Sequence, residues 1–345
     1  MSISERYGVN TMADKTGRIT LRDVAEQCGF SVNTVSRVLR GDTKLPEDTR
    51  TKISKAAEEL GYIRNNLASG LRSGKSHVIA VVVEEIQNPH YSSLINELDQ
   101  LLREKGYVVM ILCTHNDAKQ EAQMLELAIS HSVDGIFLFP ISSGVHNADR
   151  ILQTKVPIVL IDREISGLKM DLTRPDDYSG AYQAGRYLVS RGHRRFLYLG
   201  GPLVNSSHVY RRNGFRDALR EGGISPEQIL ELPHDRFYPT VNDSDDASLL
   251  EPLDFTAVFS FNDELAYYLI NKLAAAGKKV PDDIEIIGFD NIHRTISYLP
   301  KLRTISCVPG KSLAKSAVSL LLRRIEEPGC PLQQEIIPVS LCGPE

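Results

Sequence analysis

The sequence predicts a chain of two parts, a small all-α unit at the N-terminus and a larger α/β unit built on parallel sheets. Residues 19 to 64 carry apolar residues at helical spacing, with glycines where the helices would end. From residue 78 onward, short continuous apolar runs alternate with amphipathic stretches, a pattern typical of a parallel sheet covered by helices on both faces. The second part holds about 270 residues, more than one core usually organises, so we expect two sheets with a cleft between them.

Three short helices are expected in the first part. Thr20 can cap the first helix, because its hydroxyl is followed by an acidic residue three positions later. Gly29 can adopt a left-handed turn conformation, and Ser31 can cap a second helix over residues 32–40. A third helix is expected over residues 46–61, where a proline begins the segment and a glycine ends it.

The first two helices have the spacing of a helix-turn-helix motif. Ala25 is small where the two helices must approach closely, and Gly29 supplies the turn. Val35 and Val38 then pack the second helix onto the first, which makes the second a candidate recognition helix for the DNA major groove. The same spacing occurs in small helical hairpins that bind no DNA, so this alternative stays open.

The outward side of this second helix carries side chains that suit DNA. Arg37 can bond a guanine edge and Asn33 an adenine edge, while the hydroxyls of Thr34 and Ser36 suit phosphate oxygens. The predicted DNA-binding residues of the unit are Thr20, Ser31, Val32, Asn33, Thr34, Ser36, Arg37 and Arg40.

The charge distribution supports a polyanionic partner for the first part. Residues 1–76 hold 13 Lys and Arg against 9 Asp and Glu, and the remainder holds 27 against 35. The net charges are therefore +4 and −8, which place a small basic head on an acidic body.

Composition excludes several other classes of protein. The longest apolar run is Val78–Val83, far shorter than the roughly 20 residues of a membrane span, and residues 1–18 lack the apolar stretch of a signal peptide. The five cysteines contain no C-x-x-C pair, so neither a disulfide framework nor a zinc site is expected. We therefore expect a cytoplasmic protein with no membrane partner and no metal.

The elements of the second part follow from the apolar runs. Strands are expected at residues 78–83, 107–112, 135–139, 157–161, 196–199, 257–261 and 284–289. Helices are expected near residues 92–105, 118–131, 178–191, 209–221 and 263–276. Ligands in such folds bind at the carboxyl ends of the strands.

Short motifs run through both parts in a fixed order. Those of the first part are Ile19-Thr-Leu-Arg-Asp-Val-Ala-Glu, Ser31-Val-Asn-Thr-Val-Ser-Arg-Val-Leu and Leu60-Gly-Tyr62. Those of the second part include Asn88-Pro-His-Tyr91, Asp162-Arg163, Gly192-His-Arg-Arg195, Phe261-Asn-Asp263 and Gly288-Phe-Asp290. Over about residues 18 to 342, their order resembles the lactose/galactose repressor family of bacterial transcription regulators.

This resemblance implies a domain plan. Residues 1–18 are expected to be a disordered extension and residues 19–64 the helix-turn-helix domain, followed by a hinge helix and linker at 65–76. Residues 77–345 are expected to be a two-lobed effector-binding and dimerisation domain similar to periplasmic sugar-binding proteins.

The resemblance also makes residues 66–72 a hinge helix. Leu71 is expected to wedge into the minor groove, with Asn66 and Arg72 as further DNA contacts. About seven residues containing a glycine are too few for a stable isolated helix, so this segment is expected to fold only on DNA. No leucine-heptad tail follows Leu341, which implies a dimer on a pseudo-palindromic operator.

The effector site is expected where Asp162, Arg211 and Asp263 end predicted strands or begin helices. The resemblance assigns Asp162 to the first lobe and the other two to the second; the plain alternative for each is a surface salt bridge. Carboxylate and guanidinium groups suit hydroxyl-rich ligands, so the effector class is a sugar, polyol or sugar acid. The predicted effector-binding residues are His90, Tyr91, Asp162, Arg163, Arg211, Phe237, Asn262 and Asp263.

Together these features predict a ligand-responsive repressor of carbohydrate or related catabolic genes, acting as a homodimer and needing no cofactor. The sequence contains no G-x-S-x-G motif, and the glycine-rich segment 70–76 precedes a strand where a phosphate loop must follow one. We therefore expect no catalytic residues. The alternative is a sugar-binding protein of the same two-lobed fold that does not bind DNA.

Overall fold

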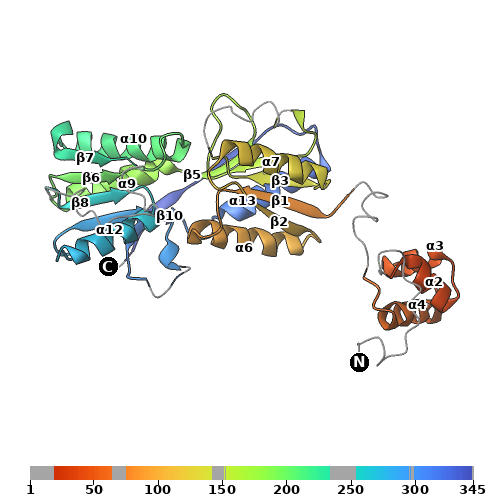
Figure 1. Cartoon of the computed structure of the whole chain (residues 1–345). Coiled ribbons are helices and arrows are strands. Elements are labelled where there is room, and N and C mark those ends of the chain that lie inside the picture. Colours follow the sequence, from red (N-terminus) through yellow and green to blue (C-terminus); the bar gives the residue numbers. More distant parts are fainter. Residues whose placement is uncertain are drawn as a thin grey trace. The chain divides into compact units, whose positions relative to one another are not determined.

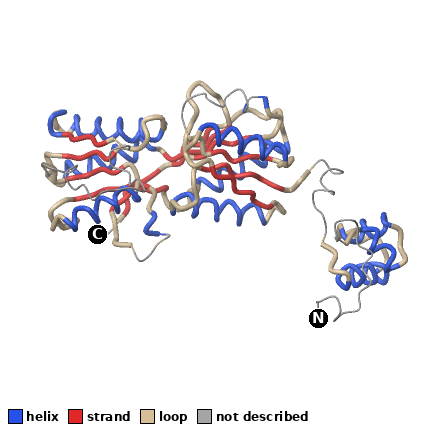
Figure 2. The backbone as a smooth tube through the Cα atoms, in the orientation of Figure 1, coloured by secondary structure: helices blue, strands red, loops and turns tan. Residues whose placement is uncertain are grey.

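The computed structural model describes residues 19–63, 75–141, 151, 153–233, 254–294, 296 and 299–343. The chain divides into two compact units, Met1–Gly74 and Lys75–Glu345 (Figures 1 and 2). The N-terminal extension and the hinge segment with Asn66, Leu71 and Arg72 lie outside the described residues, as does Phe237.

The first unit consists of three helices around one small core. They are α2 (Leu21–Cys28), α3 (Val32–Leu39) and α4 (Glu47–Glu59). Thr20 and Asp23 form a capping box at the start of α2, and Gly29 ends that helix in the left-handed conformation, with φ 72°. Val24, Val35 and Ile53, one from each helix, are fully buried against one another. The expected helical unit is therefore present.

The first lobe of the second unit contains a six-stranded parallel sheet in the order β11-β5-β4-β3-β1-β2. Its strands are β1 (Val78–Val83), β2 (Val108–Cys113), β3 (Gly135–Leu138), β4 (Ile158–Ile161), β5 (Asp171–Pro175) and β11 (Gln334–Ile337). The helices α6 (Pro89–Arg103) and α13 (Leu313–Glu326) pack on one face, and α7 (Ala118–Ser130) packs on the other. Alternate residues of β1 point to these two faces, which explains its continuous apolar run.

The second lobe contains a six-stranded sheet in the order β12-β10-β9-β8-β6-β7. Its strands are β6 (Phe196–Leu199), β7 (Ile229–Leu232), β8 (Ala257–Ser260), β9 (Glu285–Phe289), β10 (Arg303–Cys307) and β12 (Val339–Cys342), with only β10 and β12 antiparallel. The helices α9 (Asp177–Ser190) and α10 (Ser206–Glu221) cover one face, and α12 (Asp263–Ala275) covers the other. Short 3-10 helices, η1 (Pro226–Gln228) and η3 (Ile292–Arg294), complete the lobe.

The chain crosses between the lobes three times: from β5 to α9, from β10 to α13, and from β11 to β12. Figure 1 shows β5 and β10 at the waist between the two sheets. The crossings bond to one another, since Asp176 N donates to Ile337 O (2.9 Å) and Val308 N donates to Pro338 O (3.0 Å). The chain passes from β5 and from β10 to the other lobe at the carboxyl ends of these strands. The carboxyl ends of the parallel strands in both sheets therefore face the boundary between the lobes.

Several elements differ from those predicted from the sequence. The strands β5, β7, β10, β11 and β12 and the helix α13 were not predicted, and α6, expected from residue 92, starts at Pro89 behind its cap Asn88. Within the described residues, no helix is long and apolar enough to cross a membrane.

Candidate functional site

The first unit presents α3 as an amphipathic helix with a polar side. Val35 and Val38 are buried, as predicted, whereas Val32, Asn33 and Arg40 are exposed. Ser36 and Arg37 are half-buried.

Three hydroxyls of the predicted DNA-binding set already have partners in the unit. Thr20 Oγ1 donates to Asp23 Oδ2 (2.8 Å) at the start of α2. Ser31 caps α3 by accepting from Thr34 N (3.1 Å), and the two hydroxyls of Ser31 and Thr34 are hydrogen-bonded (2.8 Å). These residues therefore fix the starts of α2 and α3.

In the second unit, two aspartates at the carboxyl ends of different sheets flank one histidine. Asp162 directly follows β4, and Asp290 directly follows β9; both have positive φ, 72° and 101°. His90, in the first turn of α6, has Nε2 3.7 Å from Asp162 Oδ1 and Nδ1 3.9 Å from Asp290 Oδ1. Asp290 belongs to the motif Gly288-Phe-Asp290 but was not among the predicted effector-binding residues.

The electrostatics of this trio favour a protonated imidazole. Burial alone would lower the pKa of His90, but the carboxylates of Asp290 and Asp162 outweigh it and raise the pKa to about 9. Burial would raise the pKa of Asp162, but His90 and two neighbouring guanidinium groups hold it well below its usual range. Within the described residues, His90 Nε2 and Asp162 Oδ1 are buried and have no hydrogen-bond partner. These two atoms face each other at 3.7 Å, beyond hydrogen-bonding distance, so a ligand hydroxyl can accept from the imidazolium and donate to the carboxylate.

Arg211 is buried beside this trio and bonds within the second lobe. From α10 its Nε donates to Asp177 Oδ1 (2.7 Å) and its Nη1 to Phe261 O (2.6 Å), while Nη2 lies 3.7 Å from Asp290 Oδ1. Its guanidinium carbon lies 3.5 Å from the centre of the Phe289 ring. Arg211 thus holds the second-lobe side of the site together, in addition to any ligand contact.

The first-lobe side is organised by Arg163. Its guanidinium contacts the carboxylate of Glu84 and the hydroxyl of Tyr91, and Nη1 donates to Pro140 O (3.3 Å). Tyr91 is buried, with its ring edge-on to Phe139, so it is not an open platform for stacking a sugar. Arg163, Glu84 and Tyr91 therefore bond to one another and hold Asp162 and His90 in place on the first-lobe side.

Asn262 and Asp263 also have internal partners. Asn262 caps α12 by accepting from Leu265 N (3.0 Å). The carboxylate of Asp263 accepts from Thr304 Oγ1 (2.7 Å) and Ile292 N (2.9 Å). Burial and the charge of Asp290 raise the pKa of Asp263 to about 8. Asp263 thus ties α12 to β10 and η3.

The two lobes are joined by polar contacts near the trio. Glu164 N donates to Ser206 Oγ (3.1 Å), Tyr210 Oη donates to Glu164 Oε1 (2.7 Å), and Ser207 Oγ donates to Asp162 O (3.2 Å). A further bond runs from Asn88 Nδ2 to Glu264 Oε2 (3.0 Å). A ligand in this position would contact parts of both lobes.

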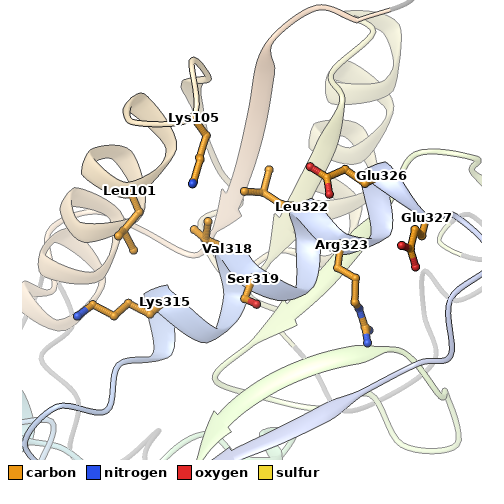
Figure 3. Close-up of a pocket in the computed structure, with 9 residues that line it drawn as sticks. All are labelled: Leu101, Lys105, Lys315, Val318, Ser319, Leu322, Arg323, Glu326 and Glu327. Carbon is orange, nitrogen blue, oxygen red and sulfur yellow. The ribbon is translucent and has the colours of Figure 1, made fainter.

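A separate pocket of about 470 Å³ lies between α6 and α13, entirely within the first lobe (Figure 3). Apolar side chains and charges of both signs line it: Leu101, Lys105, Lys315, Val318, Ser319, Leu322, Arg323, Glu326 and Glu327. Leu101 lies in the last turn of α6 and Lys105 just beyond its end, whereas His90 lies at its start. This pocket is therefore distinct from the site at the strand ends. The described residues contain no group of three or more His, Cys, Asp or Glu side chains arranged to hold a metal ion.

Comparison with known families matches both units. Residues 76–341 match the family of periplasmic binding proteins and the sugar binding domain of the LacI family, and residues 20–65 match the bacterial regulatory proteins of the lacI family. The second match favours a regulator over a sugar-binding protein that lacks a DNA-binding unit.

Individual relatives agree. The HTH-type transcriptional regulator DegA of Bacillus subtilis (strain 168) is 32% identical over 84% of this chain and 86% of its own length. The ribose operon repressor of Escherichia coli (strain K12) is 30% identical over 92% of this chain and 95% of its own length.

Solved structures support the same fold. The lac repressor dimer bound to operator and the anti-inducer ONPF has a TM-score of 0.78 at 23% identity, covering 94% of this chain and 97% of that one. A LacI family regulator from Enterococcus faecium with bound ribose has a TM-score of 0.65 at 29% identity, covering 77% and 96%.

Proposed function

Since the chain belongs to the LacI family of bacterial regulatory proteins, we propose that it is a dimeric repressor of carbohydrate or related catabolic genes, controlled by a sugar or polyol. It acts in the cytoplasm, where the first unit binds a pseudo-palindromic operator and the effector binds between the two lobes. The observation that carries this proposal is the trio of His90, Asp162 and Asp290, which draws on both lobes and whose buried charged atoms lie 3.7 and 3.9 Å apart, beyond hydrogen-bonding distance.

The chemistry of the trio favours a neutral, hydroxyl-rich effector. Asp162 can accept a hydrogen bond from a hydroxyl, and the imidazolium of His90 can donate one. The carboxylates of Asp162 and Asp290 are opposed by the imidazolium of His90 and by the guanidinium groups of Arg163 and Arg211, so the charges nearly balance and an added anion would have no unpaired cation to bind. Sugar acids are therefore the second class to test, after neutral sugars and polyols.

An exposed edge supports the dimer. The strand β2 lies at the end of its sheet, and its side chains Val108 and Ile111 are 60% and 45% exposed. An unpaired apolar edge is a liability in a monomer, and a second copy of the chain would cover it.

The effector is tested by thermal-shift screening of the full-length protein against neutral sugars, polyols and sugar acids. We expect a neutral hydroxyl compound to raise the melting temperature, because a ligand that binds only the folded state stabilises it. Stabilisation by sugar acids alone would contradict the proposed chemistry of the trio.

The DNA contact is tested with Arg37→Ala. A duplex recovered from a randomised pool by the wild-type protein serves as the operator probe. The variant should retain its fold and lose about 1–3 kcal/mol of binding free energy on this duplex, with relaxed preference at one base pair, because a bidentate arginine–guanine contact is lost. Equal losses on all duplexes would make Arg37 a phosphate contact only.

A further inference from the structure

Arg37 is held by a side chain that the sequence analysis did not single out. Its Nε donates to Asp42 Oδ2 at 2.9 Å, although Arg37 lies in the last turn of α3 and Asp42 lies beyond the end of the helix. The chain folds back because Asp42 N donates to Arg37 O (3.1 Å). The two side chains remain 43% and 24% exposed, so DNA can reach the arginine without breaking a buried pair.

Asp42 is itself fixed in place. Its second carboxylate oxygen, Oδ1, accepts from Lys44 N (2.9 Å), which closes a tight turn after the helix. Each oxygen therefore has its own partner, one in the turn and one on Arg37. The same two hydrogen bonds, with Lys44 N first and Arg37 second, lower the pKa of Asp42, so the carboxylate is ionised at neutral pH.

The bond to Asp42 holds the guanidinium group of Arg37 in an orientation that suits hydrogen bonding to a base. A guanidinium group that donates through Nε keeps both terminal nitrogens, Nη1 and Nη2, for a second partner. These are the two donors that can pair side by side with O6 and N7 of guanine. A free arginine loses up to about 2 kcal/mol of rotamer entropy when it is ordered, and the bond to Asp42 removes part of that cost in advance.

The neighbouring arginine provides a contrast. Arg40 Nε donates to a backbone carbonyl, Ser36 O, at 3.0 Å. Within the described residues Arg40 has no carboxylate partner, so its charge is available to phosphates, whereas the charge of Arg37 is partly neutralised by Asp42. This difference separates an arginine suited to base recognition from one suited to the backbone.

We propose that Asp42 is a positioning residue for DNA recognition, which orients Arg37 toward one base pair and, through its own negative charge, weakens binding to unrelated sequences. The proposal rests on the proposed base contact of Arg37. Asp42 touches no base itself and acts through the arginine.

The test is Asp42→Asn in the full-length protein. Asparagine retains the oxygen that accepts from Lys44 N and replaces the one facing Arg37 with an amide donor, so the turn survives while the contact is lost. Binding is measured on the duplex selected by the wild-type protein and on a scrambled duplex of equal length, at two salt concentrations. We expect the ratio of the two affinities to fall about three- to tenfold, with binding to the scrambled duplex equal or tighter.

Controls separate positioning from simpler effects. Glu58→Gln removes one negative charge from an exposed position on α4 and should leave the ratio of affinities within about twofold. In the Arg37→Ala background, Asp42→Asn should no longer change the ratio, because its effect passes through Arg37. Thermal unfolding of each variant reports any loss of structure.

Three outcomes would overturn the proposal. Tighter binding of Asp42→Asn to the selected duplex, with the ratio of affinities equal to or above that of the wild type, would mean that Asp42 sequesters Arg37. Equal weakening on both duplexes, with a lower melting temperature, would reduce Asp42 to a structural turn residue. An unchanged ratio for Asp42→Asn alone would remove the positioning role. If Arg37→Ala also leaves the ratio unchanged, the proposed contact of Arg37 fails as well.

Discussion

His90 is a charged side chain that lies at the centre of the candidate site, between the two lobes. Its imidazole lies between Asp162 of the first lobe and Asp290 of the second, 3.7 and 3.9 Å away. A protonated ring offsets the repulsion between the two carboxylates, so its charge stabilises this arrangement of the lobes.

This makes stability depend on pH through His90. Its pKa rises from 6.5 to about 9 on folding, so its contribution is fully present below pH 6.5 and is lost as pH rises toward 9. Between pH 6.5 and pH 9 the unfolding free energy of the wild-type second unit should fall by on the order of 3 kcal/mol more than that of the His90→Gln variant. Urea unfolding at both pH values measures the difference. His131→Gln, an exposed histidine at the end of α7, should behave as the wild type.

Arg211 is a poorer probe of the site than His90. Truncating it would leave the fully buried Asp177 without its ion-pair partner, a change that commonly costs about 3–5 kcal/mol. A loss of effector response in such a variant would therefore mix unfolding with binding.

The sequence identified some site residues because each follows an apolar run. Asp162 and Asp263 could be found in this way, since the carboxyl ends of parallel strands meet at one edge. Asp290 follows a strand equally directly, and the same rule, applied to every strand, would have found it. Which carboxylates already have partners could not be read from the sequence, because Thr304 and Ile292, the partners of Asp263, are about 30 to 40 positions away.

At the scale of elements, the sequence predicted the strands that read as continuous apolar runs, including the edge strand β2, and missed those that polar residues interrupt. The strand β5 reads Asp-Leu-Thr-Arg-Pro, and its polar residues are buried by ion pairs such as that of Asp171 with Arg324. The strands β7, β11 and β12 lie at sheet edges, with several residues partly exposed, so they lack a continuous apolar run. The helix α13 is amphipathic and follows the 3.6-residue rule, so it could have been predicted from the sequence.

The pairing of α9 with α10 depends on a glycine. A β-carbon on Gly214 of α10 would lie 2.2 Å from the backbone oxygen of Tyr178 in α9. Alanine normally favours a helix over glycine by up to about 1 kcal/mol, but here the overlap with rigid backbone outweighs that gain. Gly214→Ala should destabilise the second unit by about 1–3 kcal/mol, measured by urea unfolding. Gly329→Ala, where no atom lies within 4 Å, should stay within about 0.5 kcal/mol of the wild type.

At the scale of the whole second unit, three crossings and a few side-chain bonds control the relation of the lobes. The crossings are short; a single residue, Pro338, separates β11 from β12. Short crossings between two separately packed cores permit rotation about the waist and resist other motions. An effector can shift such an equilibrium only by binding one arrangement more tightly than the other.

The hydrogen bond between Tyr210 and Glu164 joins the two lobes and should stabilise the arrangement in which they are in contact. Tyr210 belongs to α10 of the second lobe, while Glu164 follows β4 of the first, and Arg174 of β5 lies over the tyrosine ring at 4.5 Å. Tyr210→Phe keeps the ring and its contact with Arg174 and removes only the hydroxyl. This hydrogen bond is partly exposed to water, which weakens it, so losing it should cost about 0.5–1.5 kcal/mol and lower the ratio of joined to separated lobes about two- to tenfold.

Since a ligand bridging both lobes binds the joined arrangement, Tyr210→Phe should weaken effector binding by up to about tenfold. Because the two binding events are linked, the operator affinity of the effector-free variant should differ from that of the wild type, and so should the change that the effector causes. The sequence preference of the first unit should stay the same. Calorimetric titration with the compound found by thermal-shift screening measures the first effect, and operator titration with and without that compound measures the second. Tyr182→Phe is the matched control, because Tyr182 bonds Glu221 within the second lobe alone. If both variants weaken effector binding equally, the effect belongs to the packing of α9 and α10, and the bond between the lobes plays no part in the switch.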